Sequence, residues 1–371
     1  MNPKSVSQEL LDVLSLSLIE GIGPVTAKTL ISYLGSPGAV LKANKGKLLK
    51  VPGVGESLAQ LIIGSSAFEK ADLVLKQCAA KGIQLHSYLD EQYPSRLKSI
   101  MEAPMLFYAK GNIPWEAEKT VGVVGTRSAT EYGKSVTEQI VAELAVHEAQ
   151  IISGLAYGID IAAHKSALQH GLSTIGVSAA GPDRVYPSVH TSIARQMEEN
   201  GGMISEYPPG TKPMPAQFPA RNRIIAALSD VLIVVEAAEK GGALITARFA
   251  NDFNKEVYAV PGDLGKTYSS GCLQLISNHE ARVFTTVTEL ASNMGWLTDK
   301  KSQQKHKKTK PTDLEPEQQA VYELLEQHGT VLIDQLGFLS RIEMSRLASI
   351  LLHLEFNGWV KSLPGKKYTL S

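Results

Sequence analysis

Short apolar runs alternate with amphipathic stretches through the middle of the chain. Six runs of three to five residues are each typical of a buried strand: Val121–Val124, Ile151–Ser153, Thr174–Ser178, Met203–Ser205, Val231–Val235 and Val257–Val260. Helical patterns separate most of them, for example over Gly133–His147 and Asp160–His170. Short buried strands that alternate with helices favour a mostly parallel sheet with helices on both faces. We therefore predict a doubly wound α/β domain over residues 86–298.

Two similar glycine motifs indicate a small helical domain over residues 1–85. The chain reads Gly21-Ile-Gly and later Gly53-Val-Gly, and an amphipathic helical pattern follows each motif. The pair resembles a tandem helix-hairpin-helix, in which the N–H groups of a glycine turn face a DNA phosphate. Few basic residues flank the two turns, so a tight turn between packed helices is the alternative interpretation.

The C-terminal part divides into a linker and a small domain. Residues 299–311 contain six lysines and no large apolar side chain, which predicts a flexible linker. Residues 312–371 show helical patterns at Pro316–Gln327, Val331–Leu339 and Arg341–Asn357, and then two short strands around Pro364-Gly365. This order is that of a winged helix. Its third helix has few basic residues, so a protein-interaction role is as plausible as reading of a DNA groove.

Charge and cysteine content limit the class of protein. Lysine plus arginine and aspartate plus glutamate both number 37, so any nucleic-acid site is expected to be a local patch. Cys78 and Cys272 fit no metal-ligand spacing and indicate a reduced compartment. The N-terminus does not resemble a signal peptide, and no apolar run is long enough to span a bilayer. We expect a soluble, cytoplasmic protein without a metal or cofactor.

The segment that starts at Phe218 combines an aromatic ring, two arginines and a helical apolar pattern. The pattern predicts a helix start near Ala220, which places Arg221 and Arg223 in the first turn. Cations there cost about 0.3–1 kcal/mol each, because they face the positive end of the helix dipole. A bound anion would reverse that sign. The segment therefore predicts a phosphate site beside a ring, for a nucleotide or a single-stranded nucleic acid.

Three glycine-containing loops follow predicted strands. They are Gly125-Thr-Arg, Ser153-Gly-Leu-Ala-Tyr-Gly and Lys240-Gly-Gly. Loops at the carboxyl ends of parallel strands line the ligand crevice of such sheets, so we expect them to converge with Phe218–Arg223. None is a dinucleotide-binding fingerprint or a Walker A loop, which argues against ordinary dinucleotide binding and ATPase activity.

These motifs, in this order, resemble the DNA-processing protein A (DprA/Smf) family. The resemblance is dense over roughly residues 90–290, and it also includes Ser205-Glu-Tyr-Pro-Pro-Gly and Ala259-Val-Pro-Gly. It implies an extended Rossmann-like domain between a helix-hairpin-helix-like domain and a winged helix. It further implies a homodimer, without catalytic activity, that binds and protects single-stranded DNA and loads the RecA recombinase onto it during natural transformation.

The resemblance also implies which residues contact DNA or phosphate. By motif these are Gly125, Thr126, Arg127, Gly154, Gly158, Phe218, Arg221, Asn222, Arg223, Lys240, Gly241 and Gly242. Pro215 stands where some members carry a lysine that helps to bind DNA, and Lys212 is the nearest substitute.

Several residues allow two interpretations. Glu206 and Glu236 either orient Arg221 and Arg223, which we favour, or form a carboxylate pair for glycosidic chemistry. Asp160 and His164 lie four residues apart on a predicted helix, where a structural hydrogen bond that fixes the helix start is favoured over an acid–base pair. Phe218 is interpreted as an exposed stacking ring in preference to a core residue, and Cys272 as a buried apolar residue.

Two alternative functions remain from the sequence. One is an enzyme of the lysine-decarboxylase-like (LOG) group, which cleaves nucleoside monophosphates. Its Pro-Gly-Gly-x-Gly-Thr-x-x-Glu motif is not matched by Lys240-Gly-Gly-Ala-Leu-Ile-Thr-Ala-Arg-Phe. The other is a small-nucleotide sensor that signals through the C-terminal domain.

Overall fold

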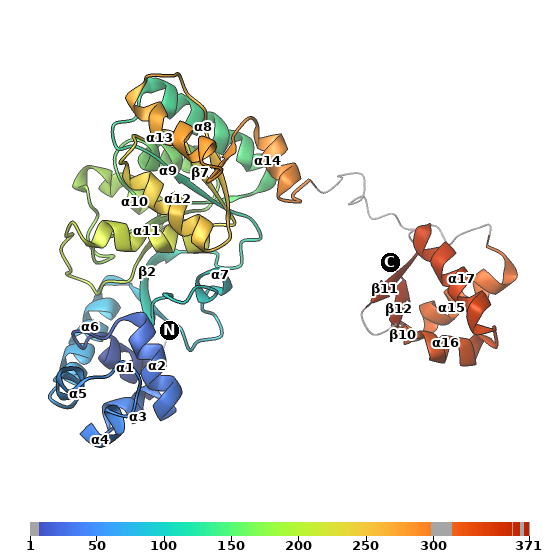
Figure 1. The fold of residues 1–371 in the computed structure, drawn as a ribbon, viewed down its shortest axis with the longest axis horizontal. Helices are drawn as coiled ribbons and strands as arrows, with labels where there is room; N and C mark the ends of the chain where they lie inside the picture. The colour runs from blue at the N-terminus through green and yellow to red at the C-terminus, as the bar shows by residue number, and fades with distance from the viewer. Residues whose placement is uncertain (1–6, 298–313, 358, 364–366, 371) are drawn as a thin grey trace. The chain divides into compact units, whose positions relative to one another are not determined.

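The computed structural model describes residues 7–297, 314–357, 359–363 and 367–370. These residues form two compact units that are divided after Trp296 (Figure 1). The expected lysine-rich linker, residues 299–311, lies outside the described residues. Within the described part of the chain, no helix is both long enough and apolar enough to cross a membrane.

A helical part opens the first unit and is drawn in blue in Figure 1. Its helices are α1 (Gln8–Ser17), α2 (Pro24–Leu34), α3 (Pro37–Leu41), α4 (Lys45–Leu48), α5 (Glu56–Ile63) and α6 (Ala67–Lys81). The two glycine turns lead into α2 and α5, whose N-cap residues are Gly23 and Gly55. Buried side chains of these helices share one apolar cluster with Leu106 and Tyr108. The helical part is therefore packed onto the sheet that follows it.

The rest of the first unit is built on a nine-stranded sheet. The strands are β1 (Gln84–Ser87), β2 (Leu106–Asn112), β3 (Thr120–Val124), β4 (Gln150–Ser153), β5 (Thr174–Val177), β6 (Gly201–Ser205), β7 (Val231–Val234), β8 (Glu256–Ala259) and β9 (Arg282–Val283). Their order is β1-β2-β6-β5-β4-β3-β7-β8-β9. Pairing from β6 to β9 is parallel, whereas β2 pairs antiparallel with both β6 and β1. The predicted mostly parallel α/β sheet is confirmed, and β3 to β8 are the six predicted strands.

Strand β2 lies in a segment that the apolar pattern did not identify as a strand. Leu106 and Tyr108 pack against the N-terminal helices, while Phe107 and Ala109 pack into the main core. Both faces of the strand are covered, so its sequence lacks the alternation of apolar and polar positions that marks a half-exposed strand. The strand extends the parallel sheet and connects it to the helical part.

Helices cover both faces of the sheet (Figure 1). They are α7 (Ser95–Lys98), α8 (Glu131–Leu144), α9 (Ile159–Gln169), α10 (Thr191–Met197), α11 (Gln217–Leu228), α12 (Gly242–Asp252), α13 (Thr267–Ser277) and α14 (Val287–Asn293). Val121 and Val123 of β3 point to the face covered by α8, α9 and α14. Val124 and Leu232 belong to the opposite face, which α11, α12 and α13 cover. Alternating side chains of each strand thus form two cores.

The second unit has the order of elements of a winged helix. It contains α15 (Pro316–His328), β10 (Val331–Leu332), α16 (Ile333–Ser340), α17 (Met344–Phe356), β11 (Val360–Leu363) and β12 (Lys367–Leu370). The strands pair in the order β10-β12-β11. In α17, Arg346 is paired with Glu317 (2.8 Å) and Glu315 (3.4 Å). This arginine is therefore engaged within its own domain.

Candidate nucleic-acid-binding site

A pocket of about 620 Å³ lies where the loops after β3 and β7 separate. Strands on either side of this point are connected in opposite directions along the sheet, which is where doubly wound sheets bind ligands. Its walls come from the loop after β3, the start of α9, the loop after β5, the segment that enters α11, and the start of α12. Segments far apart in the sequence therefore meet in one cavity.

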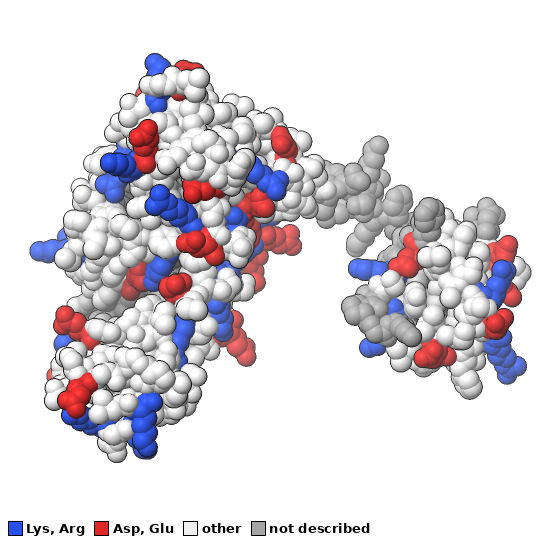
Figure 2. Space-filling model, in the orientation of Figure 1, with Lys and Arg blue, Asp and Glu red and all other residues white. Residues whose placement is uncertain are grey.

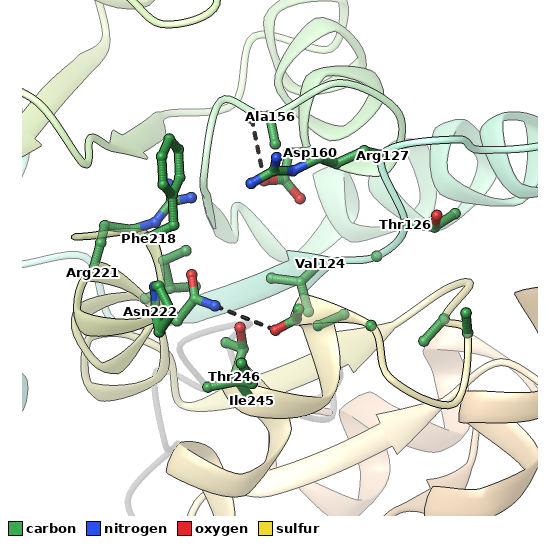
Figure 3. Close-up of a pocket in the computed structure, with 18 of the residues that line it drawn as sticks. Val124, Thr126, Arg127, Ala156, Asp160, Phe218, Arg221, Asn222, Ile245 and Thr246 are labelled. Atoms are coloured by element: carbon green, nitrogen blue, oxygen red, sulfur yellow. Dashed lines mark hydrogen bonds between the residues drawn. The ribbon is translucent and has the colours of Figure 1, made fainter. Parts of the chain in front are cut away.

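Arg127 and Phe218 form the mouth of this pocket. Figure 3 shows Arg127, from the loop after β3, and Phe218, from α11, approaching each other from opposite sides. The Arg127 guanidinium carbon lies 5.1 Å from the centre of the Phe218 ring, within range of a cation–π contact. Arg127 is exposed and Phe218 is half-buried. The ring is thus neither a core residue nor a fully open platform.

The helix that carries the two arginines begins earlier than predicted. It starts at Gln217 and not near Ala220, because Pro219 lies in the first turn, where its missing N–H group is not needed. Arg221 and Arg223 are consequently in the second turn. The prediction that they face the positive end of the helix dipole is wrong, and their positions must be explained by their side-chain contacts.

Arg221 lies at the inner wall of the pocket and is 4 % exposed. Its guanidinium donates hydrogen bonds to the carbonyl oxygens of Gly154, directly after β4, and of Val177, the last residue of β5. Gly154 is required for this approach, since a Cβ atom there would collide with the guanidinium. Burial lowers the pKa of Arg221 to about 10, so the group stays charged at neutral pH. Arg221 therefore connects two strand ends beneath the mouth.

Asp160 supplies the negative charge nearest to Arg221. Burial raises the pKa of the Asp160 carboxyl, and the neighbouring Arg221 opposes that shift. The carboxylate accepts a hydrogen bond from the Ala156 N–H at 3.3 Å (Figure 3). Gly158 caps the helix that carries Asp160, at φ +77°, and a Cβ atom there would meet the backbone of Thr126 and Arg127. This glycine lets the β4 loop lie against the β3 loop.

Of the two glutamates predicted to orient the arginines, only Glu206 does so. Arg223 is paired with Glu206 through two hydrogen bonds of 3.0 and 2.7 Å, as we predicted for one of the two arginines. Glu236 does not orient Arg221. It accepts hydrogen bonds from the N–H (2.9 Å) and hydroxyl (2.5 Å) of Thr130, the N-cap residue of α8. The position of Glu236 follows from its proximity to a helix N-terminus, which attracts a carboxylate.

The start of α12, which packs beside α11, forms another wall of the pocket. Gly241 and Gly242 line the pocket, and the Asn222 side chain donates to the Gly242 carbonyl at 3.3 Å. Thr246, one helical turn after Gly242, lines the pocket as well. Lys240 is exposed but does not line it. Backbone N–H groups at the first turn of this helix have no side-chain cap in the structure.

Eight of the twelve predicted site residues line the pocket. These are Gly125, Thr126, Arg127, Phe218, Arg221, Asn222, Gly241 and Gly242. Gly154 and Gly158 shape its loops from behind, Arg223 pairs with Glu206 outside it, and Lys240 lies beyond its rim. Sequence reasoning missed Tyr186, Asp160 and Thr246 as lining residues. Tyr186 could have been found from its position in the loop after a parallel strand.

His164 lies in the buried layer behind the pocket and is not bonded to Asp160. Its Nδ1 lies 2.7 Å from the Thr174 hydroxyl, which donates its own hydrogen to the Ile151 carbonyl. Nδ1 must therefore carry the hydrogen, and Nε2 has no hydrogen-bond partner among the residues that the structure describes. The predicted structural hydrogen bond at the start of this helix is made by Asp160, which accepts from the Ala156 N–H, and it does not involve His164. The helical spacing is present, but His164 points at β5.

We expect His164 to make the protein sensitive to acid. Burial, and then the charges of His190 and Arg221, lower its pKa from the ordinary 6.5 to about 3. The unfolded chain therefore binds the proton more readily, and stability that is present above pH 6.5 is lost as the pH falls towards 3. Below pH 6.5 this group makes the free energy of unfolding fall by about 1.4 kcal/mol for each pH unit. Urea unfolding at pH 7.0, 6.0 and 5.0 gives the free energy of unfolding at each pH. This free energy should depend less on pH in His164→Asn than in the unmodified protein. Equal pH dependence in the two proteins would contradict the assignment.

Charges outside the pocket do not form a broad field on the face shown in Figure 2. Basic and acidic side chains are interspersed there over both parts of the first unit, which agrees with the equal totals of 37. Any affinity for a polyanion on this face must therefore come from local groups of basic side chains.

Comparison with protein families gives three matches. The family model described as "DNA recombination-mediator protein A" matches residues 84–295. A "SAM-like Helix-hairpin-helix tandem" matches residues 11–65, and a "DprA winged helix domain" matches residues 305–366. These matches correspond in order to the helical part, the sheet and the C-terminal unit.

Individual relatives agree with these matches. Protein Smf of a Synechocystis species is 32 % identical over 96 % of this chain and 97 % of its own. DNA processing protein DprA of Bacillus subtilis is 40 % identical over 56 % of this chain and 71 % of its own. Among solved structures, DprA from Streptococcus pneumoniae is similar at a TM-score of 0.62 with 30 % identity, covering 78 % of this chain and 98 % of that one. DprA from Helicobacter pylori is similar at a TM-score of 0.52 with 30 % identity, covering 57 % of this chain and 95 % of that one. Its structure is described as giving insight into single-stranded DNA binding.

Proposed function

The chain belongs to the DNA recombination-mediator protein A family, and from that premise we propose that it binds single-stranded DNA in the pocket between the β3 and β7 loops. The observation that carries the proposal is the contact between Arg127 and Phe218 at the mouth. A positive charge beside an aromatic ring suits a phosphate followed by an unpaired base. The H. pylori relative is described as binding single-stranded DNA, which supports the same ligand here.

The buried residues of the pocket keep this mouth in place. Arg221 holds the ends of β4 and β5 together, and Gly158 allows the β4 loop to approach Arg127. The first turn of α12 lines the same cavity, and a helix N-terminus is suited to a phosphate oxygen. In this account Arg127 and the α12 N-terminus contact the backbone, Phe218 contacts a base, and Arg221 positions the loops.

The proposed role in the cell follows the family. We infer that the protein protects incoming single strands and loads the RecA recombinase onto them during transformation, as a homodimer. The names of the B. subtilis and S. pneumoniae relatives, which are DNA processing proteins, support a role in DNA processing. The pairing of Arg346 within the winged helix is consistent with a protein-binding role for that unit.

We propose that the site performs no glycosidic chemistry. A catalytic carboxylate of a nucleotide-cleaving enzyme has to reach the bond it cleaves. The Glu236 carboxylate is held by the N–H and hydroxyl groups of Thr130, and the segment Lys240–Phe249 has no glutamate at the position that the LOG group uses. Release of free base from nucleoside monophosphates by purified protein, abolished by Glu236→Ala, would contradict this.

A length series tests the proposed ligand. Fluorescence anisotropy with labelled oligothymidylates of 4 to 20 nucleotides, with thymidine monophosphate as competitor, separates a strand-binding protein from a nucleotide sensor. We expect affinity to rise with length and the mononucleotide to compete poorly, because each further nucleotide adds contacts. Tight binding of the mononucleotide without any gain from length would favour the sensor.

Arg127→Ala is expected to weaken binding to all sequences alike. Arg127 is exposed at the mouth, so it can neutralise one phosphate without a large desolvation cost. The slope of log affinity against log salt should then fall by about 0.7–1. Titrations at four salt concentrations measure it, and Arg127→Lys, which keeps the charge, should retain the slope. An unchanged slope in Arg127→Ala would remove this residue from the phosphate contacts.

A further inference from the structure

Tyr186 is an aromatic residue of the pocket with no role in the site described above. It comes from the loop after β5 and lines the same cavity as Phe218. The Tyr186 side chain is 51 % exposed, and a smaller fraction of Phe218 is exposed. Single exposed rings are common on protein surfaces, so exposure alone carries no meaning. What sets Tyr186 apart is its contact with the second ring of a pocket.

The two rings touch and leave no slot between them. Their centres are 5.8 Å apart and their planes are inclined by 58°. A base inserted between two rings needs them nearly parallel and further apart, so no base fits there in this arrangement. Arg127 also lies over the Phe218 ring. The larger free aromatic surface at the mouth is therefore that of Tyr186.

The loop that presents Tyr186 is fixed at several points. Three residues before it, the Asp183 carboxylate accepts a hydrogen bond from the Gly210 N–H at 2.8 Å and pairs with Lys81 of α6 at 2.5 Å. The Gly181 N–H donates to the Thr211 carbonyl at 3.1 Å. Anchoring of this kind holds a ring in position before a ligand arrives, which reduces the entropy lost on binding.

From this arrangement we infer that Tyr186 is a second base-stacking surface, so that the pocket takes two adjacent unpaired bases, one at Phe218 and the next on the exposed face of Tyr186. The inference rests on the proposed binding of single-stranded DNA and specifies what part of the strand the pocket recognises. A mononucleotide would use only one of the two surfaces. The site is thus selective for a strand over a free nucleotide.

The test uses the full chain and ten-nucleotide single strands that are abasic except for one thymine or two adjacent thymines. In the unmodified protein, the second thymine is expected to raise affinity roughly tenfold, in the range of one base stacked on a ring. In Tyr186→Ala, and in Tyr186→Leu, which keeps apolar volume without a ring, the second thymine should raise affinity by no more than about twofold. That is the statistical factor that a second equivalent base contributes. Tyr186→Phe should behave as the unmodified protein.

Tyr132→Ala is the matched control, since Tyr132 is similarly exposed at 56 % but lies outside this pocket. It should keep the full gain from the second thymine. The inference is overturned if the second thymine raises the affinity of both Tyr186→Ala and Tyr186→Leu as much as that of the unmodified protein. That result would leave the proposed strand binding intact. If the unmodified protein fails to bind an all-thymine strand, the proposed function itself is wrong.

Discussion

Replacement of Arg221 by alanine is expected to destabilise the protein by about 3–5 kcal/mol, the range for removal of one partner from a buried charged pair. The guanidinium is 4 % exposed and binds the carbonyls at the ends of two strands. Its loss leaves those carbonyls without their donor and leaves the buried Asp160 without its nearest positive charge. Urea unfolding followed by circular dichroism measures the change.

Arg248 provides the matched control for this experiment. It lies on α12 in the same unit and is exposed, so Arg248→Ala should change stability by less than about 0.5 kcal/mol. If Arg221→Ala instead unfolds like the unmodified protein and only binds DNA more weakly, Arg221 is a ligand-facing residue. The structural role assigned to it here would then be incorrect.

Replacement of Phe218 by alanine is expected to weaken binding of single-stranded DNA roughly ten- to a hundredfold, the range for removal of one base-stacking ring. The effect should reach the upper end, because the Phe218 ring also contacts the Tyr186 ring. Stability should change less than with Arg221→Ala, since the ring is only half-buried. Anisotropy titrations with an oligothymidylate measure the affinity.

Two further variants at this position separate stacking from simple apolar contact. Phe218→Tyr keeps the ring and should bind nearly as well as the unmodified protein. Phe218→Leu keeps apolar volume and should bind nearly as weakly as Phe218→Ala. With a fully abasic strand, all four proteins should bind alike, because the backbone contacts are unaltered. Equal losses on abasic and thymine strands would show that Phe218 acts through the fold of the pocket and not through a base.

The six central strands were predictable because each is buried on both faces and reads as an apolar run between turn signals. Strand β2 has the same burial, yet it lies between the short helix α7 and a segment without a helix, so the alternation with helices did not mark it. Of its two neighbours in the sheet, β6 is distant in sequence and β1 has only a weak apolar pattern. Antiparallel pairing across such separations depends on packing with the N-terminal helices, which local patterns do not contain.

The site was predictable at the level of loops and less so at the level of side chains. Glycines after parallel strands correctly indicated which loops meet, since they are needed where backbones approach closely, as at Gly158. Arg221 and Arg223 have the same charge and are two residues apart, but one points to the strand ends and the other to Glu206. Which side each faces depends on the exact helix start, and Pro219 shifted that start by about one turn.

Competition between single-stranded and duplex DNA of the same sequence, at one fixed salt concentration, tests the central claim most directly. The pocket mouth needs an unpaired base to contact Phe218, and the bases of a duplex are already stacked on one another. We predict that the single strand binds at least about tenfold more tightly, which equals the stacking of one base, and that Phe218→Ala removes most of this preference. Equal affinity for single strand and duplex in the unmodified protein would contradict the assignment of this pocket to single-stranded DNA.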